Sequence, residues 1–171
     1  MRKLVLIGAV VLVSGCGGDS KSSTSTTAAT TTSTSAATTA SSTLTHAQFV
    51  HQLDTLCAEG NKTFTAKDKE IQSALNANDA ARAGAIINSE VSTMNGFLSQ
   101  IEKLTPPGAD QPAFARYVLL TRRIIGLEQR VASALEANNI DEANRLGNLL
   151  TAAQGPRTNA AVDLGTTHCG T

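Results

Sequence analysis

Between residues 20 and 43 the chain consists almost entirely of Ser, Thr and Ala, and this stretch limits what can fold. It contains 18 Ser or Thr residues, five Ala and one Lys. No large apolar side chain is available for burial, so nothing offsets the conformational entropy lost on ordering. We therefore predict a disordered tether over residues 16–43, with an r.m.s. reach of about 30 Å, and a folded domain over residues 44–171.

The first 15 residues have the organisation of a bacterial lipoprotein signal. Two basic residues precede an apolar run over 4–13, which leads into Val13-Ser14-Gly15-Cys16. As a helix this run would span about 15 Å, too little for a bilayer core of about 30 Å, so it suits a cleaved signal peptide. We expect Cys16 to be the lipidated first residue, anchoring the protein to the bacterial cell membrane outside the cytoplasm. An ordinary secretion signal with an incidental cysteine is the alternative.

Overall charge gives no indication of a polyanionic partner. The chain has 14 Lys or Arg against 14 Asp or Glu, and it contains no Trp. Proteins that bind nucleic acid usually carry excess positive charge, and those that bind single strands use aromatic side chains for stacking. We therefore expect no nucleic-acid partner.

Residues 44–171 carry apolar side chains at helical spacing and lack the alternating β-branched runs of strands. The expected helix starts are Thr45, Asp79, Asp110 and Asp141. The order and short connections predict an all-α fold, a four-helix bundle of two αα-hairpins with up-down-up-down topology. Gly155-Pro156 is expected to kink or break the fourth helix, leaving a last short helix that ends near Gly165.

Two segments 60 residues apart resemble each other. Residues 73–80 read SALNANDA and residues 133–141 read SALEANNID. Each combines a helix end, an Asn-rich turn and a helix start, so we expect two hairpin turns of the same build. Duplication and the independent use of a common turn sequence both explain the similarity.

Besides Cys16, the chain has Cys57 and Cys169. In an up-down-up-down bundle the end of the fourth helix returns toward the start of the first, and an oxidising compartment favours a disulfide. We predict a Cys57–Cys169 bridge, worth about 4–5 kcal/mol by the chain-entropy estimate. Two free thiols in a metal or catalytic site are the alternative, but they lack partners at useful spacing.

The sequence contains no recognisable catalytic or metal-binding motif. His46, His51 and His168 do not have the spacing of ligands on one helix face, and no Glu-x-x-His, P-loop or nucleophile-elbow motif is present. The acidic side chains of the helices occur singly, which favours solvated faces; they are Glu70, Glu90, Glu102, Glu128 and Glu142. We expect no catalytic residues, no metal, no cofactor and no enzymatic activity.

Two further features have both a functional and a structural interpretation. Arg116, Arg123 and Arg130 share one face of the third helix, as a contact strip for an acidic partner or wall polymer, or as an ordinary solvated face. Glycines inside the helices allow either close helix packing or space for an apolar ligand; they are Gly60, Gly84, Gly96, Gly126 and Gly147.

Two segments contain the cysteines of the domain: 54–59 (DTLCAE) contains Cys57, and 161–169 (AVDLGTTHC) ends at Cys169. With these segments, the overall plan resembles small all-helical envelope lipoproteins of actinobacteria. The resemblance implies fold and location and carries over no catalytic residue. We expect a non-catalytic interaction or binding domain on a lipid anchor, with a cell-wall or envelope protein as partner. The alternative is a carrier of small apolar ligands or lipids inside the bundle.

Overall fold

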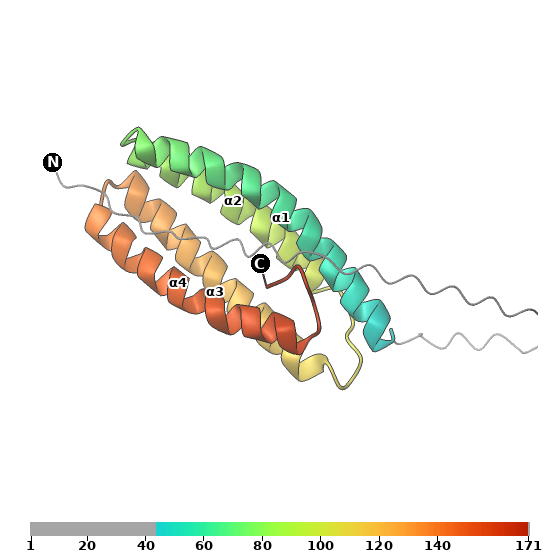
Figure 1. The fold of residues 1–171 in the computed structure, drawn as a ribbon. Coiled ribbons are helices and arrows are strands. Elements are labelled where there is room, and N and C mark those ends of the chain that lie inside the picture. The colour runs from blue at the N-terminus through green and yellow to red at the C-terminus, as the bar shows by residue number, and fades with distance from the viewer. Residues whose placement is uncertain (1–43, 171) are drawn as a thin grey trace, which may run out of the picture. The chain divides into compact units, whose positions relative to one another are not determined.

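The computed structural model describes residues 44–170. The segment Val13-Ser14-Gly15-Cys16 (the lipobox) and the whole of the expected tether lie outside the described residues. Four helices follow one another, α1 (His46–Asn76), α2 (Ala80–Ile101), α3 (Gln111–Glu136) and α4 (Ile140–Asp163) (Figure 1). All regular structure within residues 44–170 is helical, so the prediction of an all-α domain is confirmed.

The helices form a four-helix bundle of two hairpins, as predicted (Figure 1). α1 packs on α2, α2 on α3 and α3 on α4. Within the described part of the chain, α4 makes no close backbone approach to α1. Instead the C-terminal tail over residues 164–170 bonds to both helices: Asn61 of α1 donates to the carbonyl of His168, and Thr158 of α4 donates to that of Gly170.

The two hairpin turns have the same build, residue for residue. Asn78 has φ 58° and Asn138 has φ 54°. The backbone N–H of each donates to the carbonyl three residues earlier, and the next N–H donates to the carbonyl five residues earlier. This is the Schellman arrangement, in which a residue with positive φ closes a helix. Asp79 and Asn139 then act as N-caps for α2 and α4.

The helix ends show which of the capping residues predicted from the sequence cap a helix in the structure. Thr45 and Gln48 form the predicted capping box at the start of α1. Gly165 has φ +78° and closes α4, also as predicted. Asp110 precedes α3 but its side chain makes no cap hydrogen bond; its carboxylate lies 2.8 Å from His46 Nδ1 instead. The prediction of Asp141 as the start of α4 was off by two residues, since Asn139 is the cap.

Of the kink or break expected at Gly155-Pro156, the break is wrong: the helix continues through Pro156 to Asp163, and no separate last helix forms. Proline removes one backbone N–H and so leaves the carbonyl four residues earlier, on Ala152, without its usual donor. Ala152 and Pro156 are both exposed, so water can solvate that carbonyl. Ala153 before the proline and Ala160 after it are buried, which holds both halves of the helix against the bundle.

The hydrophobic core consists of two clusters. One lies toward the hairpin turns and includes Ile71, Leu135 and Leu146. The other lies toward the α2–α3 connection and includes Phe49, Phe114 and Leu164. Between them the helices bring polar and charged side chains to the same level of the bundle, and these positions form the candidate site.

Candidate functional site

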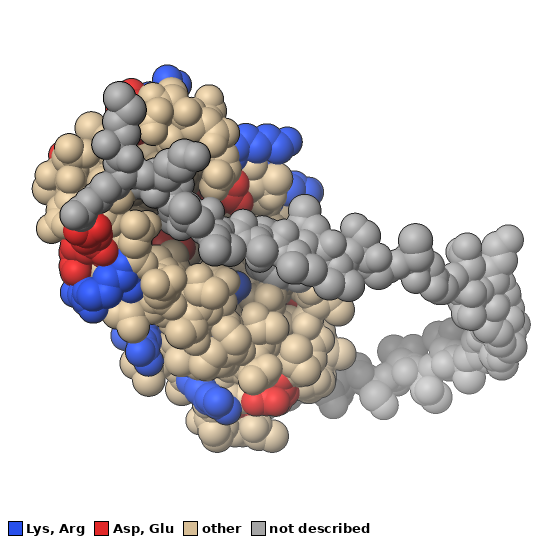
Figure 2. All heavy atoms as spheres, turned by 60° about the vertical axis from the view of Figure 1, so that its left-hand side comes forward, with Lys and Arg blue, Asp and Glu red and all other residues tan. Residues whose placement is uncertain are grey.

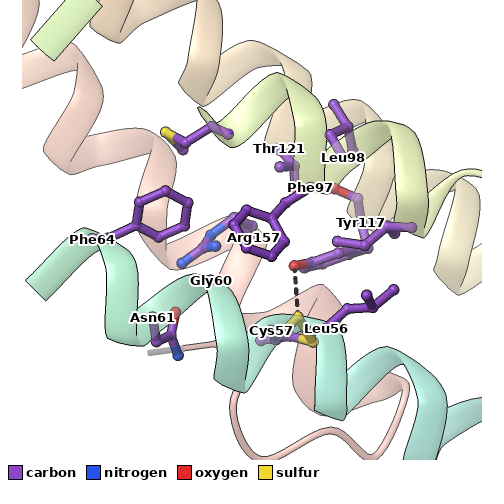
Figure 3. Close-up of a pocket in the computed structure, with 13 residues that line it drawn as sticks. Leu56, Cys57, Gly60, Asn61, Phe64, Phe97, Leu98, Tyr117, Thr121 and Arg157 are labelled. Carbon is purple, nitrogen blue, oxygen red and sulfur yellow. Dashed lines mark hydrogen bonds between the residues drawn. A yellow bond between two sulfur atoms is a disulfide. The ribbon is translucent and has the colours of Figure 1, made fainter. Parts of the chain in front are cut away.

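A cavity lies in the bundle between the two apolar clusters, and all four helices contribute to its wall (Figure 3). The space open to the centre of a water molecule is about 50 Å³, and the empty space including the open mouth is about 430 Å³. A water needs roughly 10–15 Å³ of the first kind of space. The cavity is therefore large enough for several waters or a small organic group.

Most of the wall is apolar. Phe64 of α1 and Phe97 of α2 meet edge to face with ring centroids 5.9 Å apart, and Met94 and Leu98 lie beside them. Gly60 faces the same space, and a Cβ there would lie 3.1 Å from Phe64 Cε2. The missing side chain at position 60 thus gives the Phe64 ring its place at the cavity.

Arg157 is the one charged residue among the described residues that line the cavity. It projects from α4 toward the aromatic pair (Figure 3). Its guanidinium interacts with the hydroxyl of Tyr117, whose pKa burial raises. Cys57 Sγ lies 3.5 Å from the same hydroxyl. The floor of the cavity thus combines a cation with a buried phenol.

Two buried side-chain atoms have no hydrogen-bond partner within the described residues. They are Arg157 Nε, which carries an N–H donor, and Glu128 Oε2, a carboxyl oxygen. Arg157 and Glu128 influence each other electrostatically, yet none of the ion pairs of residues 44–170 includes Arg157. Buried polar atoms in native proteins are almost always hydrogen-bonded. At these two atoms, therefore, the fold leaves hydrogen-bonding groups that a bound molecule could satisfy.

Glu90 and Glu128 bring two carboxyl groups into the same layer. Burial raises the pKa of Glu90 to about 7, with a further increase from Asp68 and a decrease from Lys67. Burial also raises the pKa of Glu128 to about 8, and the nearby Glu90 adds to the effect. Glu128 is therefore mostly protonated at neutral pH. Lys67 and Asp68 lie at the solvent edge of this layer on α1, where Lys67 donates to Ser89 Oγ at 3.1 Å.

The C-terminal tail closes the bundle beside the cavity. Cys57 and Cys169 are joined at an S–S distance of 2.08 Å, the pairing expected from the sequence. Asp54 accepts hydrogen bonds from the backbone N–H groups of Thr167 and His168 and from the Thr167 hydroxyl. Burial alone would raise the pKa of Asp54, but these hydrogen bonds lower it to about 2. The tail is thus attached to α1 covalently and by a carboxylate that stays ionised.

The arginine strip expected on α3 is exposed. Arg116 lies 3.7 Å from Asp163, and Arg130 lies 3.8 Å from Glu142, so α4 supplies acidic neighbours for two of its three members. Arg123 is exposed as well. Acidic and basic side chains are interspersed on the face shown in Figure 2. The strip is therefore not a concentrated patch of positive charge.

The histidines do not gather at one site. His46 pairs with Asp110, and His168 Nδ1 lies 3.0 Å from Asp54 Oδ2. His51 is exposed on α1. No group of three or more His, Cys, Asp or Glu within residues 44–170 is arranged to hold a metal ion.

The sequence left two roles open for the helical glycines, close helix packing and space for a ligand, and the structure shows one glycine at each kind of position. At Gly84 a Cβ would lie 2.7 Å from the Ala132 carbonyl oxygen, so this glycine permits close packing of α2 on α3. Gly60 faces the cavity. The other three glycines singled out from the sequence have no atom within 4 Å of such a Cβ; they are Gly96, Gly126 and Gly147.

Glu90 and Glu128 were predicted to lie on solvated faces, and this was wrong: Glu90 is 8% exposed and Glu128 has a buried oxygen. Their burial could have been predicted from the sequence, because both glutamates lie at helical spacing from apolar residues. Glu90 lies three residues after Ile87, and Glu128 lies four after Ile124. Arg157, which sequence reasoning missed, lies four after the buried Ala153. Charged residues at such positions face the interior.

No helix within residues 44–170 has the length and apolar character needed to cross a membrane. No protein-family model, curated protein or solved structure matches the chain.

Proposed function

We propose that the protein is a lipid-anchored bacterial envelope lipoprotein whose helical domain is a non-catalytic module that binds a small molecule. The anchor rests on the lipobox and Cys16. The binding function rests on one observation: a cavity lined from all four helices that contains a buried guanidinium nitrogen without a hydrogen-bond partner. The resemblance to actinobacterial envelope lipoproteins supports the location and implies no ligand.

The energetic cost of the polar layer supports a binding function. Replacing buried charged groups with apolar residues of similar volume is often neutral or stabilising. Glu90, Glu128 and Arg157 therefore do not serve stability in the way that the two apolar clusters do. Residues that break the local pattern of a fold are expected at functional sites.

A non-catalytic role fits the chemistry of the wall. Cys57 and Cys169 are bonded to each other, and the Thr121 hydroxyl donates to the carbonyl of Tyr117 in its own helix. A nucleophile beside a general base is the usual requirement for covalent catalysis. Neither group offers that combination.

The alternative is a carrier of apolar ligands or lipids, favoured by the Phe64, Phe97 and Met94 wall. A long acyl chain needs more room than the present 50 Å³, so such a carrier would have to open between the aromatic rings. Native mass spectrometry of the full chain purified from its membrane separates the two functions. A bound mass of a few hundred daltons favours the small-molecule module, and a bound lipid favours the carrier.

The control is a variant with a filled cavity. Gly60→Leu places a side chain in the cavity, whereas Gly126→Leu makes the same change where nothing lies within 4 Å. We expect Gly60→Leu to lose the bound mass and Gly126→Leu to keep it, with melting curves recorded for both. If Gly60→Leu does not fold, Thr121→Leu fills the same space from α3. No bound mass in the unaltered protein, or equal retention in a folded filled variant, would contradict a binding function for this cavity.

A further inference from the structure

We propose that the cavity binds a small organic molecule with a carboxylate head and a short apolar body, and that Arg157 holds the carboxylate. This inference rests on the binding function proposed above and names its ligand class. It follows from three observations on the cavity: Arg157 has no counter-ion, most of the wall is apolar, and the enclosed space is small.

The cation lacks a counter-ion. Arg157 Nε is buried without a hydrogen-bond partner, and no carboxylate forms an ion pair with this guanidinium within the described residues. Glu128 is the acid that influences Arg157, but burial raises its pKa to about 8, so at neutral pH it is mostly uncharged. A buried guanidinium N–H group without an acceptor is costly. An anion bound at Arg157 would remove that cost.

The geometry of the guanidinium favours a carboxylate. Its N–H groups form a planar fork that matches two carboxylate oxygens, with Nε as one prong. The Tyr117 hydroxyl already interacts with this guanidinium, and it can donate to a bound oxygen. A phosphate carries up to two negative charges, and Arg157 is the one charged residue among the described residues that line the cavity. The second charge would stay uncompensated, which disfavours phosphate relative to a singly charged carboxylate.

The wall and the size define the rest of the ligand. Phe64 and Phe97 lie beside Arg157 at the cavity (Figure 3). With Met94, which also lines it, they offer contact to an apolar chain or ring. The enclosed space of about 50 Å³ is well below the roughly 300–1,000 Å³ of most ligand sites. The ligand is therefore a small acid, whose apolar end reaches into the open mouth of the cavity between these side chains.

The test uses the full chain with Cys16→Ser, so that neither lipid nor detergent competes for the cavity. Hexanoate and benzoate are the carboxylate probes, hexanol and benzyl alcohol their uncharged matches, and hexylphosphonate the competing anion. Isothermal titration calorimetry measures each affinity. We expect the carboxylates to bind roughly 10- to 100-fold more tightly than the alcohols and more tightly than the phosphonate.

Variants test the role assigned to Arg157. Arg157→Gln should weaken hexanoate binding roughly 10- to 100-fold while leaving hexanol binding unchanged. Arg157→Lys should recover part of the loss, because it restores the charge without the fork. Arg123→Gln, the same change at an exposed position of α3, should have no effect.

The outcomes separate this inference from the proposed function. Equal affinity for acid and alcohol, tighter binding of the phosphonate, or unchanged hexanoate binding in Arg157→Gln would overturn the carboxylate assignment. In each of those cases the cavity still binds, and Gly60→Leu should abolish that binding. If no probe binds and no mass is retained by the native protein, the binding function itself is contradicted.

Discussion

Gly84 and Gly96 both lie within α2, yet a methyl group has opposite consequences at the two positions. A Cβ at Gly84 would lie 2.7 Å from the Ala132 carbonyl oxygen and 3.1 Å from the Glu136 nitrogen, both backbone atoms of α3. Backbone atoms of a packed helix cannot move independently, so α2 and α3 would have to separate. At Gly96 nothing lies within 4 Å.

We therefore predict that Gly84→Ala lowers the free energy of unfolding by about 1–3 kcal/mol, as overpacking does. Gly96→Ala, the matched control, should raise it by up to about 1 kcal/mol through better helix propensity. Urea denaturation followed by circular dichroism measures both. A neutral Gly84→Ala would mean that α2 and α3 are not in close contact there.

Glu90 and Glu128 make stability depend on pH. An unperturbed Glu titrates near 4.5, whereas the folded protein holds these protons up to about pH 7 and 8. The folded state binds the protons more tightly, so the stabilisation is fully present below pH 4.5 and is lost as pH rises through 7 and 8. Charged neighbours of the pair are Asp68, which reinforces the effect, and Lys67 and Arg157, which reduce it.

We predict that the free energy of unfolding falls by several kcal/mol between pH 5 and pH 9. The upper bound is about 7 kcal/mol, because the two carboxyls hold their protons for about 5 pKa units in all above pH 5, each worth about 1.4 kcal/mol. The double variant Glu90→Gln, Glu128→Gln should remove most of this slope, whereas the exposed Glu70→Gln should retain it. Urea titrations at a series of pH values supply the measurement. A flat profile in the unaltered protein would show that the two carboxyls are not buried as described.

At the scale of elements, the hairpin turns were predictable because their signals are local. An Asn with positive φ followed by an N-cap is written in adjacent residues. The continuity of α4 was not predictable in this way, since it depends on Ala153 and Ala160 packing against helices distant in sequence. Tertiary packing there outweighs the local preference of Gly155-Pro156 for a break.

The matching turns should respond alike to the same substitution. Asn78 and Asn138 have φ values of 58° and 54°, a region that costs most side chains roughly 1–2 kcal/mol. We predict that Asn78→Ala and Asn138→Ala each destabilise the domain by about 1 kcal/mol, and that the corresponding Gly variants lose nothing. Thermal melts of the four variants provide the comparison. Alanine variants as stable as the glycine variants would argue against the positive φ.

At the scale of the whole molecule, the bundle could be predicted from sequence but its polar layer could not. Each helix contributes one or two polar residues to that layer, and a position within an apolar stripe indicates that a residue is buried but not which other residues it meets. Only the register between helices shows that Glu90, Glu128 and Arg157 lie at one level. The interruption of the first apolar stripe near Gly60 and Lys67 was visible in the sequence, and it coincides with the cavity and the edge of the layer.

The C-terminal tail, rather than direct packing, joins α4 to α1, so the disulfide should contribute strongly to stability. Cys57 and Cys169 are 112 positions apart, which corresponds to about 4–5 kcal/mol in the chain-entropy estimate. We predict that the double variant Cys57→Ser, Cys169→Ser loses about that amount in urea denaturation. Peptide mapping without reductant should recover one linked Cys57–Cys169 peptide. Two alkylatable thiols in the oxidised protein would contradict the pairing.

The proposed anchor makes a prediction for the location of the whole chain. If Cys16 carries the lipid, Cys16→Ser removes the acyl chains, whose burial contributes about 0.8 kcal/mol per CH₂ group. No helix within residues 44–170 could replace them as a membrane span. We therefore expect the Cys16→Ser protein in the soluble fraction after cell disruption. The Cys57→Ser, Cys169→Ser protein, which keeps Cys16, should stay with the membranes. Membrane-bound Cys16→Ser protein after a high-salt wash would contradict the lipobox assignment, and mass spectrometry of the N-terminal peptide identifies any lipid directly.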